Sequence, residues 1–156
     1  CPCGAVKLWY SGDDSGQGSQ HLLDWYSPSH LIHGFLFYGA LWLVARRLPV
    51  GWRLFIATLV EAGWEMLENT EAVISRYREF TVSGEYWGDA VVNSAADIAM
   101  MFVGFWLALR LPLWLSIAII VFFEVLTTWL IRDGLTLNII MLVAPSEAIL
   151  NWQSGG

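Results

Sequence analysis

The stretch PLWLSIAIIVFFEVLTTWLI, residues 112–131, decides the fold class of this chain. Its 20 residues include a single charged side chain, Glu124. A helix of this length extends for about 30 Å, which matches the thickness of the hydrocarbon core of a bilayer. The stretch is therefore typical of a transmembrane helix.

The composition of the whole chain favours the same environment. The sequence is 56% hydrophobic and 14% charged, whereas a soluble domain usually has about 25% charged residues. It also has 10 Trp, 5 Tyr and 8 Phe residues, and such aromatic side chains gather where helix ends meet lipid headgroups. The alternative is a soluble helical bundle with an apolar oligomer interface.

The charge excludes one class of partner. The net charge is −6, with 8 Lys and Arg residues and no basic cluster longer than Arg46-Arg47. Proteins that bind nucleic acid neutralise phosphates with basic patches. We therefore expect no nucleic-acid partner.

Three further apolar segments precede residues 112–131 in the chain, at residues 29–45, 51–69 and 88–109. The paired Arg46-Arg47 and the Arg110-Leu111-Pro112 turn separate neighbouring segments. We predict an all-α, polytopic membrane protein, a compact bundle of about four transmembrane helices. The predicted helices lie near residues 29–46, 52–70, 88–110 and 112–132.

The remaining segments complete a single membrane domain over residues 1–156. Residues 1–27 are predicted to form a polar extramembrane segment. Ser27 is the predicted N-cap of the next helix, and Pro28 lies in its first turn. Residues 70–87 form a polar loop that has room for a helical stretch at the interface. Residues 135–153 form a short C-terminal segment, re-entrant or interfacial, because its apolar part is too short to span.

The N-terminal Cys-Pro-Cys-Gly places Cys1 and Cys3 too close together for an unstrained bridge. We interpret them as two free or externally paired thiols.

The basic residues predict the orientation. Short connections hold Arg46, Arg47, Arg53 and Arg110, whereas the basic residues of the opposite side are spread over longer stretches. Because short cytoplasmic loops are enriched in Lys and Arg, we expect these connections to be cytoplasmic. The N-terminus, residues 70–87 and the C-terminus would then face outward.

Every predicted helix carries polar residues, and helical spacing places them on shared faces. His30 and His33 are three apart, Glu61, Glu65 and Glu68 are spaced i, i+4, i+7, and Asp89, Asn93 and Asp97 are spaced i, i+4, i+8. Antiparallel threading brings these groups to one half of the membrane. Ionisable groups in spanning helices usually face the bundle interior. We predict one outward-facing cleft with Glu124 at its floor.

Residue types suggest roles within this cleft. The candidates for a catalytic role are His30, His33, Glu61, Glu65 and Asp97. The candidates for binding are Glu68, Arg76, Asp89, Asn93 and Glu124. The candidate metal ligands are His30, His33 and Glu65, which suit Zn, Mn or Fe.

Each role has a structural alternative. The same polar residues can form a hydrogen-bonded network that only holds the helices together. Arg76 or Arg78 is expected to fold over the cleft mouth as a counter-charge to Glu68 or Asp89. No sequence motif identifies a cofactor or shows that the protein is an enzyme.

The chain resembles a small bacterial inner-membrane family of unknown function. The resemblance rests on Cys3-Gly4-Ala5-Val6-Lys7-Leu8-Trp9, Ser19-Gln20-His21, Asp24-Trp25-Tyr26-Ser27-Pro28-Ser29-His30, His33-Gly34-Phe35-Leu36-Phe37-Tyr38-Gly39, residues 61–69, Gly88-Asp89 with Asn93-Ser94, Asp97, and Ile131-Arg132-Asp133 with Leu135-Thr136-Leu137-Asn138. It covers nearly the whole chain. It implies a multi-pass protein of the bacterial inner membrane, with a further hydrophobic helix before Cys1, and it implies no activity.

A looser pattern resembles VanZ-like membrane proteins, which are associated with teicoplanin resistance. The residues that match in order are His30, Glu61 or Glu65, Arg76, Asp89 and Asn93.

Two function classes follow. In the first, the cleft binds or acts on a small or lipid-linked molecule reached from the outer face. In the second, the protein is a non-catalytic accessory subunit that packs against a larger membrane complex. The lipid bilayer is the partner in both.

Overall fold

The computed structural model describes residues 4–12 and 15–155, and this part of the chain is helical without a β-strand. The described helices are α1 (Ser15–Gly18), α2 (Ser27–Val44), α3 (Val50–Glu68), α4 (Glu71–Phe80), α5 (Val91–Arg110), α6 (Leu113–Ile131), α7 (Leu135–Val143) and α8 (Glu147–Gln153). Cys1 and Cys3 lie outside the described residues.

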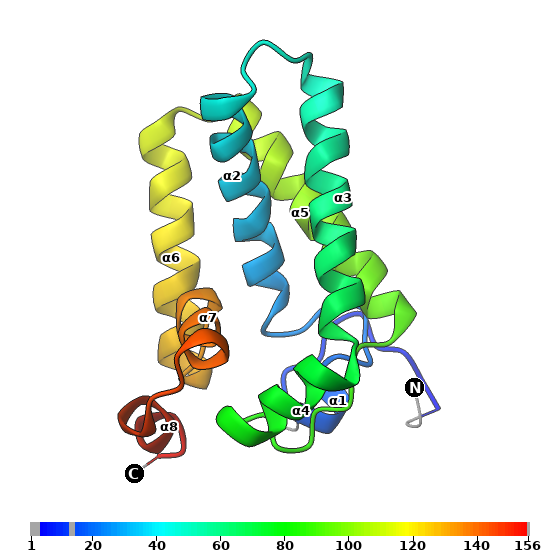
Figure 1. The fold of residues 1–156 in the computed structure, drawn as a ribbon, viewed down its shortest axis with the longest axis vertical. Coiled ribbons are helices and arrows are strands. Elements are labelled where there is room, and N and C mark those ends of the chain that lie inside the picture. The colour runs from blue at the N-terminus through cyan, green and yellow to red at the C-terminus, as the bar shows by residue number, and fades with distance from the viewer. Residues whose placement is uncertain (1–3, 13–14, 156) are drawn as a thin grey trace.

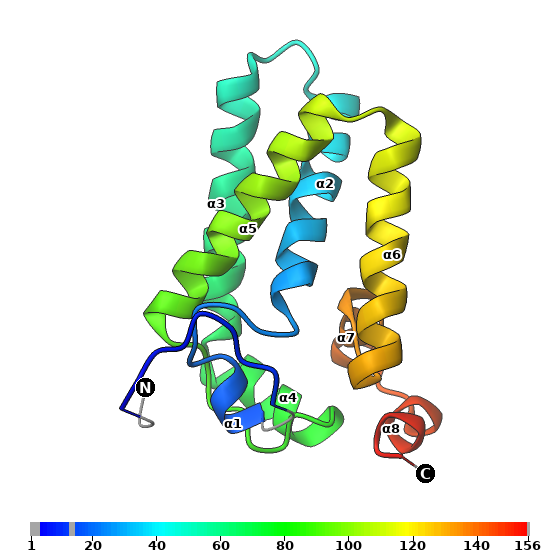
Figure 2. The same cartoon turned by 180° about the vertical axis from the view of Figure 1, so that it is seen from behind.

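The long helices α2, α3, α5 and α6 run alternately up and down as a bundle (Figure 1). Helix α2 packs most extensively against α5 and also contacts α3 and α6. The short helices α1, α4 and α8 gather at the end of the bundle where α2 and α5 begin, as both views show (Figure 2). That end therefore collects the short helices and polar connecting segments of the described chain.

The long helices agree with the predicted segments to within about three residues at each end. Two of them, Val91–Arg110 and Leu113–Ile131, are long and apolar enough to cross a membrane by length and composition. Helix α3 carries Arg53, Glu61, Glu65 and Glu68, and the first turns of α2 are polar. The all-helical fold is confirmed, two apolar helices give weak support for a membrane protein, and the four-span topology stays a prediction.

Glycines let α2 and α5 approach each other closely. A Cβ atom placed on Gly34 would lie 2.2 Å from the carbonyl oxygen of Met101, and one on Gly104 would lie 2.0 Å from that of Leu31. Gly34 and Gly104 are therefore close-packing points between the two helices. Gly39 of α2 is not, because a Cβ atom there would meet nothing within 4 Å.

Beside this crossing, the buried side chains of Ala57, Met101 and Phe105 form an apolar core. This core joins α3 to α5 next to α2. The polar side chains described below are positioned by the same three helices.

The start of α2 is capped differently from the prediction. Asp24 Oδ1 accepts hydrogen bonds from the backbone N–H groups of Tyr26 (2.8 Å) and Ser27 (3.2 Å), and Ser27 Oγ accepts one from Asp24 N (3.0 Å). These reciprocal side-chain to backbone hydrogen bonds resemble those of a capping box. Ser27 is already the first helical residue, so the prediction of Ser27 as N-cap is wrong, and Pro28 does lie in the first turn.

Asp133 connects the C-terminal helices to α2. Its carboxylate accepts hydrogen bonds from the Tyr26 hydroxyl (3.1 Å), the Gln153 side-chain amide (3.2 Å) and the Gly134 backbone N–H (2.8 Å). The Asp133 side chain is buried. It therefore links the start of α2, the α6–α7 turn and α8 at one end of the bundle.

Candidate functional site

A cavity of about 570 Å³ lies between the helices and is lined by side chains from α2, α3, α5, α6 and α7 together with neighbouring loops. The polar residues that line it include His30, His33, Glu61, Asp97 and Asn93. These residues come from α2, α3 and α5, the three helices that pack around the Gly34–Gly104 crossing. The cavity is therefore built on the most closely packed part of the fold.

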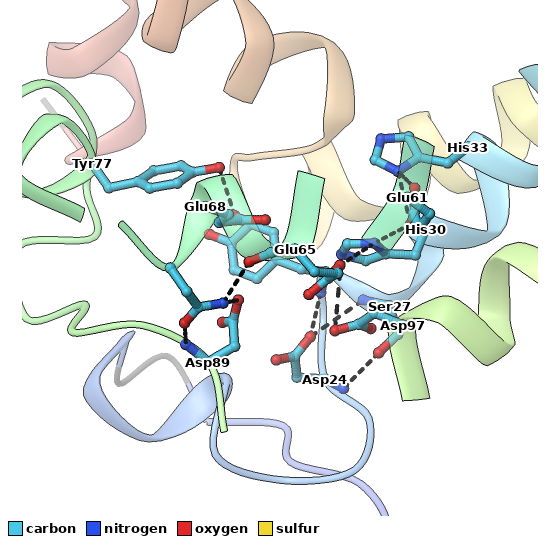
Figure 3. Close-up of polar contacts among 12 residues, drawn as sticks. Asp24, Ser27, His30, His33, Glu61, Glu65, Glu68, Tyr77, Asp89 and Asp97 are labelled. Carbon is cyan, nitrogen blue, oxygen red and sulfur yellow. Dashed lines mark hydrogen bonds and ion pairs between the residues drawn. The ribbon is translucent and has the colours of Figure 1, made fainter. Parts of the chain in front are cut away.

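Glu61 lies between His33 and His30 (Figure 3). Its carboxylate is fully buried. His30 Nδ1 lies 2.8 Å from Glu61 Oε1, and His33 Nδ1 lies 3.1 Å from Oε1 and 3.0 Å from Oε2. Because His30 and His33 are one helical turn apart, both imidazoles of α2 reach the same carboxylate of α3.

Two more carboxylates surround His30. Glu65 Oε1 lies 3.4 Å from His30 Nδ1, and Asp97 Oδ2 lies 3.9 Å from His30 Nε2. Glu65 and Asp97 are 5% and 4% exposed, so water reaches neither freely. Within the part of the chain that the structure describes, both Glu65 oxygens and Asp97 Oδ1 make no hydrogen bond. The five candidate catalytic residues of the sequence analysis are thus brought together.

Glu68 and Asp89 lie further along, on the side of α4 (Figure 3). Glu68 Oε1 is 2.8 Å from the Tyr77 hydroxyl, which is also 3.0 Å from Asn138 Oδ1. Asp89 Oδ2 accepts a hydrogen bond from the Asn69 side-chain amide at 3.2 Å. Glu68 and Asp89 line the same cavity as Glu61. They extend the polar side of the cavity towards the α4 segment.

The predicted counter-charge is not formed by Arg76 or Arg78. Arg76 Nε donates to the backbone carbonyl of Leu142, and its guanidinium lies over the Phe80 ring. Arg78 Nε donates to the backbone carbonyl of Tyr86. Both arginines lie on α4, and both bind carbonyls of neighbouring segments in place of a carboxylate. The prediction that one of them pairs with Glu68 or Asp89 is wrong.

Glu124 is also in a different place from the prediction. Its carboxylate accepts hydrogen bonds from the backbone N–H groups of Leu135 (2.9 Å) and Thr136 (3.1 Å). The first N–H groups of a helix have no partner within the helix, and negative charge is favoured there. Glu124 therefore caps α7 and is not among the residues that line the cavity.

Asp24 lines the cavity and was missed by the sequence analysis. It lies in the extended N-terminal segment, where helical spacing gives no information about faces. The available signal was Asp24-Trp25-Tyr26-Ser27, an acidic residue three positions before a serine at a helix start. Burial raises the pKa of Asp24, and this effect exceeds the opposite effect of its two backbone hydrogen bonds.

The raised pKa of Asp24 predicts a pH dependence of stability. Burial also raises the pKa values of Asp89 and Asp133, so the folded protein holds these protons more tightly than the unfolded chain does. The free energy of unfolding should therefore fall as the pH rises from about 4, the usual aspartate pKa, through the higher folded values. Replacing Asp24 with Asn should flatten this fall, because Asn keeps an acceptor oxygen and does not titrate.

The measurement is the midpoint of thermal unfolding in detergent between pH 4 and pH 8, for the wild type and Asp24→Asn. Identical pH profiles for the two proteins would show that Asp24 does not titrate as described.

Ligand atoms of the polar side chains fall into two groups, each with all atoms within 4.8 Å of one another. One group contains His30, His33 and Glu61, and the other contains His30, Glu65 and Asp97. Imidazole nitrogens and carboxylate oxygens are ligands for Zn, Mn and Fe, and they can also transfer protons. The arrangement suits either kind of chemistry.

Comparison with known proteins identifies relatives over almost the whole chain. Residues 1–155 match the family described as "Protein of unknown function (DUF2585)". A UPF0314 protein of Paracoccus denitrificans is 60% identical over 154 residues, which cover 99% of this chain and 80% of that protein. A UPF0314 protein of Rhizobium etli (strain CIAT 652) is 53% identical over 155 residues, covering 99% and 80%. A third, from Novosphingobium aromaticivorans, is 52% identical over 161 residues, covering 100% and 81%.

No solved structure matches the chain. The comparisons confirm the resemblance to an uncharacterised bacterial family. The VanZ-like resemblance stays a prediction.

Proposed function

This chain belongs to the DUF2585 family of proteins of unknown function, and we propose that it is a multi-pass protein of the bacterial inner membrane that binds a lipid-linked molecule. The ligand enters an outward-facing cleft, which is the cavity around Glu61. The polar head of the ligand lies against His30, Glu61 and Asp97, and its apolar part lies between the helices.

The membrane part of the proposal is supported by the surface of the long helices. Large apolar side chains of α6 are exposed, among them Ile117, Val121, Phe122, Val125 and Trp129. A soluble monomer rarely exposes such a continuous apolar surface. Lipid contact around α6 accounts for it, and burial of Glu61 and Asp97 in the interior is what a bilayer requires.

The ligand part rests on one observation, the mixed lining of the cavity. Charged side chains line it near His30, while Phe37, Val60, Trp64 and Ile139 contribute apolar surface. Binding sites for small molecules combine an apolar wall with a few convergent polar groups. A molecule with a polar head and a hydrocarbon part matches both surfaces. The histidines and carboxylates are also suited to acid–base chemistry on that head group.

A pair of neighbouring substitutions tests the cleft. Ile139 of α7 lines the cavity, whereas Ile140, the next residue, is not among the lining residues. Ile139→Trp should fill the cavity and abolish recovery of the ligand, and Ile140→Trp should leave recovery unchanged. The measurement is mass spectrometry of lipids that copurify with the full-length protein in nanodiscs, compared with the lipids of nanodiscs without protein.

A lipid enriched in the wild type, retained in Ile140→Trp and lost in Ile139→Trp supports the proposal. The absence of any enriched lipid, or equal enrichment in both variants, would contradict it.

The exposed face of α6 also supports the second function, that of an accessory subunit. The same side chains could contact a larger membrane complex through Phe122, Val125 and Trp129. Crosslinking through a photoreactive residue at position 125 in native membranes separates the two functions. Products with lipid only favour the ligand-binding function, and a single discrete protein product favours the subunit.

A further inference from the structure

We propose that His30, His33 and Glu61 bind one divalent transition-metal ion, with Zn²⁺ as the best match in ligand type. The inference deepens the proposed binding site, and it rests on that proposal for the place where the ligand's head group would meet the ion. The ligands are the two Nδ1 atoms of α2 and the carboxylate of α3.

The spacing of the ligand atoms fits a shared ion. Zn–N and Zn–O bonds are about 2.0–2.2 Å, so neighbouring ligand atoms of a tetrahedral ion lie roughly 3.3 Å apart. The Nδ1 atoms lie 2.8 Å (His30) and 3.0–3.1 Å (His33) from the Glu61 oxygens. Ligand atoms of all three residues lie within 4.8 Å of one another, so the side chains would have to adjust their positions only locally to hold one ion.

The number of protein ligands indicates what the ion could do. Three protein ligands leave a fourth position open, as in zinc sites that bind water or substrate. A phosphate or carboxylate oxygen of the ligand's head group could occupy that position. The acidic cavity would then accept an anionic head group that it would otherwise repel.

Charge around His30 provides a second, independent observation. Glu65 is 5% exposed, its two oxygens make no hydrogen bond among the described residues, and Oε1 lies 3.4 Å from His30 Nδ1. Three buried carboxylates, Glu61, Glu65 and Asp97, thus share two imidazoles. Buried charges are normally paired or bound to a metal. A divalent cation compensates two of the three negative charges while both imidazoles remain neutral.

Asp97 lies on the other side of the same imidazole. Its Oδ2 is 3.9 Å from His30 Nε2, the nitrogen that the ion would leave free, which is within ion-pair range but longer than a hydrogen bond. Metal-binding histidines usually donate this second N–H to a carboxylate, which fixes the tautomer and the ring orientation. We assign Asp97 as the positioning residue for His30. Asp97→Asn should weaken Zn²⁺ binding by about 10- to 100-fold without abolishing it.

Binding of Zn²⁺ to the purified full-length protein, after treatment with chelator, tests the inference. The wild type should bind about one ion per chain by calorimetry and elemental analysis. Glu61→Gln and His33→Gln should lose this site, and His33 is the safer variant because its side chain is 14% exposed. Glu124→Gln is the matched control, since that carboxylate caps α7.

Loss of Zn²⁺ in Glu61→Gln and His33→Gln, with retention in Glu124→Gln, supports the inference even where no lipid is recovered. A wild-type protein without saturable Zn²⁺ binding would overturn it. Equal binding by His33→Gln and the wild type would overturn it as well. Neither result would contradict a lipid ligand found by mass spectrometry.

Discussion

Replacing Glu61 with Leu is expected to lower the free energy of unfolding by about 3 kcal/mol, because it removes the acceptor that the buried His30 and the partly buried His33 share. The carboxylate is fully buried and lies within 3.1 Å of both His30 Nδ1 and His33 Nδ1. Leucine has a similar volume, so lost packing contributes little. The measurement is reversible unfolding in mixed detergent micelles, followed by tryptophan fluorescence.

The same experiment on a second site shows whether the polar groups act together. Asp97→Leu should also destabilise, and the double variant Glu61→Leu/Asp97→Leu should lose less than the sum of the single effects, by about 1 kcal/mol or more. The reason is that both carboxylates lie beside His30. Each single substitution disturbs the interactions of this imidazole, so the second substitution has fewer interactions left to disturb. Additivity within about 0.5 kcal/mol would contradict a connected site.

Replacing Gly104 with Ala is expected to destabilise the bundle by about 3 kcal/mol, because the added methyl group would lie against backbone. A Cβ atom there would be 2.0 Å from the Leu31 carbonyl oxygen, so α2 and α5 must move apart. Gly34→Ala should have an effect of similar size, since its nearest atom is also a backbone oxygen. The measurement is the unfolding midpoint in detergent.

Gly63→Ala is the matched control, because it lies in a long helix and a Cβ atom there would meet nothing within 4 Å. Alanine has a higher helix propensity than glycine by about 1 kcal/mol, so this variant should be unchanged or slightly more stable. If Gly104→Ala and Gly63→Ala had the same effect, the close crossing of α2 and α5 would be wrong.

The helices and the shared face of the polar residues could be predicted from sequence because both depend on local periodicity. The apolar runs fix where α2, α3, α5 and α6 lie, and the spacing of Glu61 and Glu65 fixes a common face. His30 and His33 follow the same rule. The convergence of these residues with Asp97 then needed only antiparallel threading of the helices.

What could not be predicted depends on the path of the loops and on competition for partners. Glu124 is the one charged residue of an apolar helix, which led us to expect it in the cleft. The N-terminus of α7 instead offers its carboxylate two backbone N–H groups. Arg76 reaches a carbonyl of α7, because the chain brings Leu142 alongside α4. Asp24 lies in a segment without periodicity, and only the fold of residues 4–12 and 15–26 brings it to the cavity. For Glu124 and Arg76, backbone groups from another segment determined the outcome.

The central claim is that two imidazoles of α2 converge on the carboxylate of Glu61, and ¹⁵N NMR of the histidine side chains tests it most directly. The chain has three histidines, so His21, which lies outside the cavity lining, serves as an internal reference. In metal-free protein, Glu61→Gln is predicted to shift the Nδ1 signals of both His30 and His33 and to leave those of His21 in place. Unchanged signals for His30 and His33 would contradict the account.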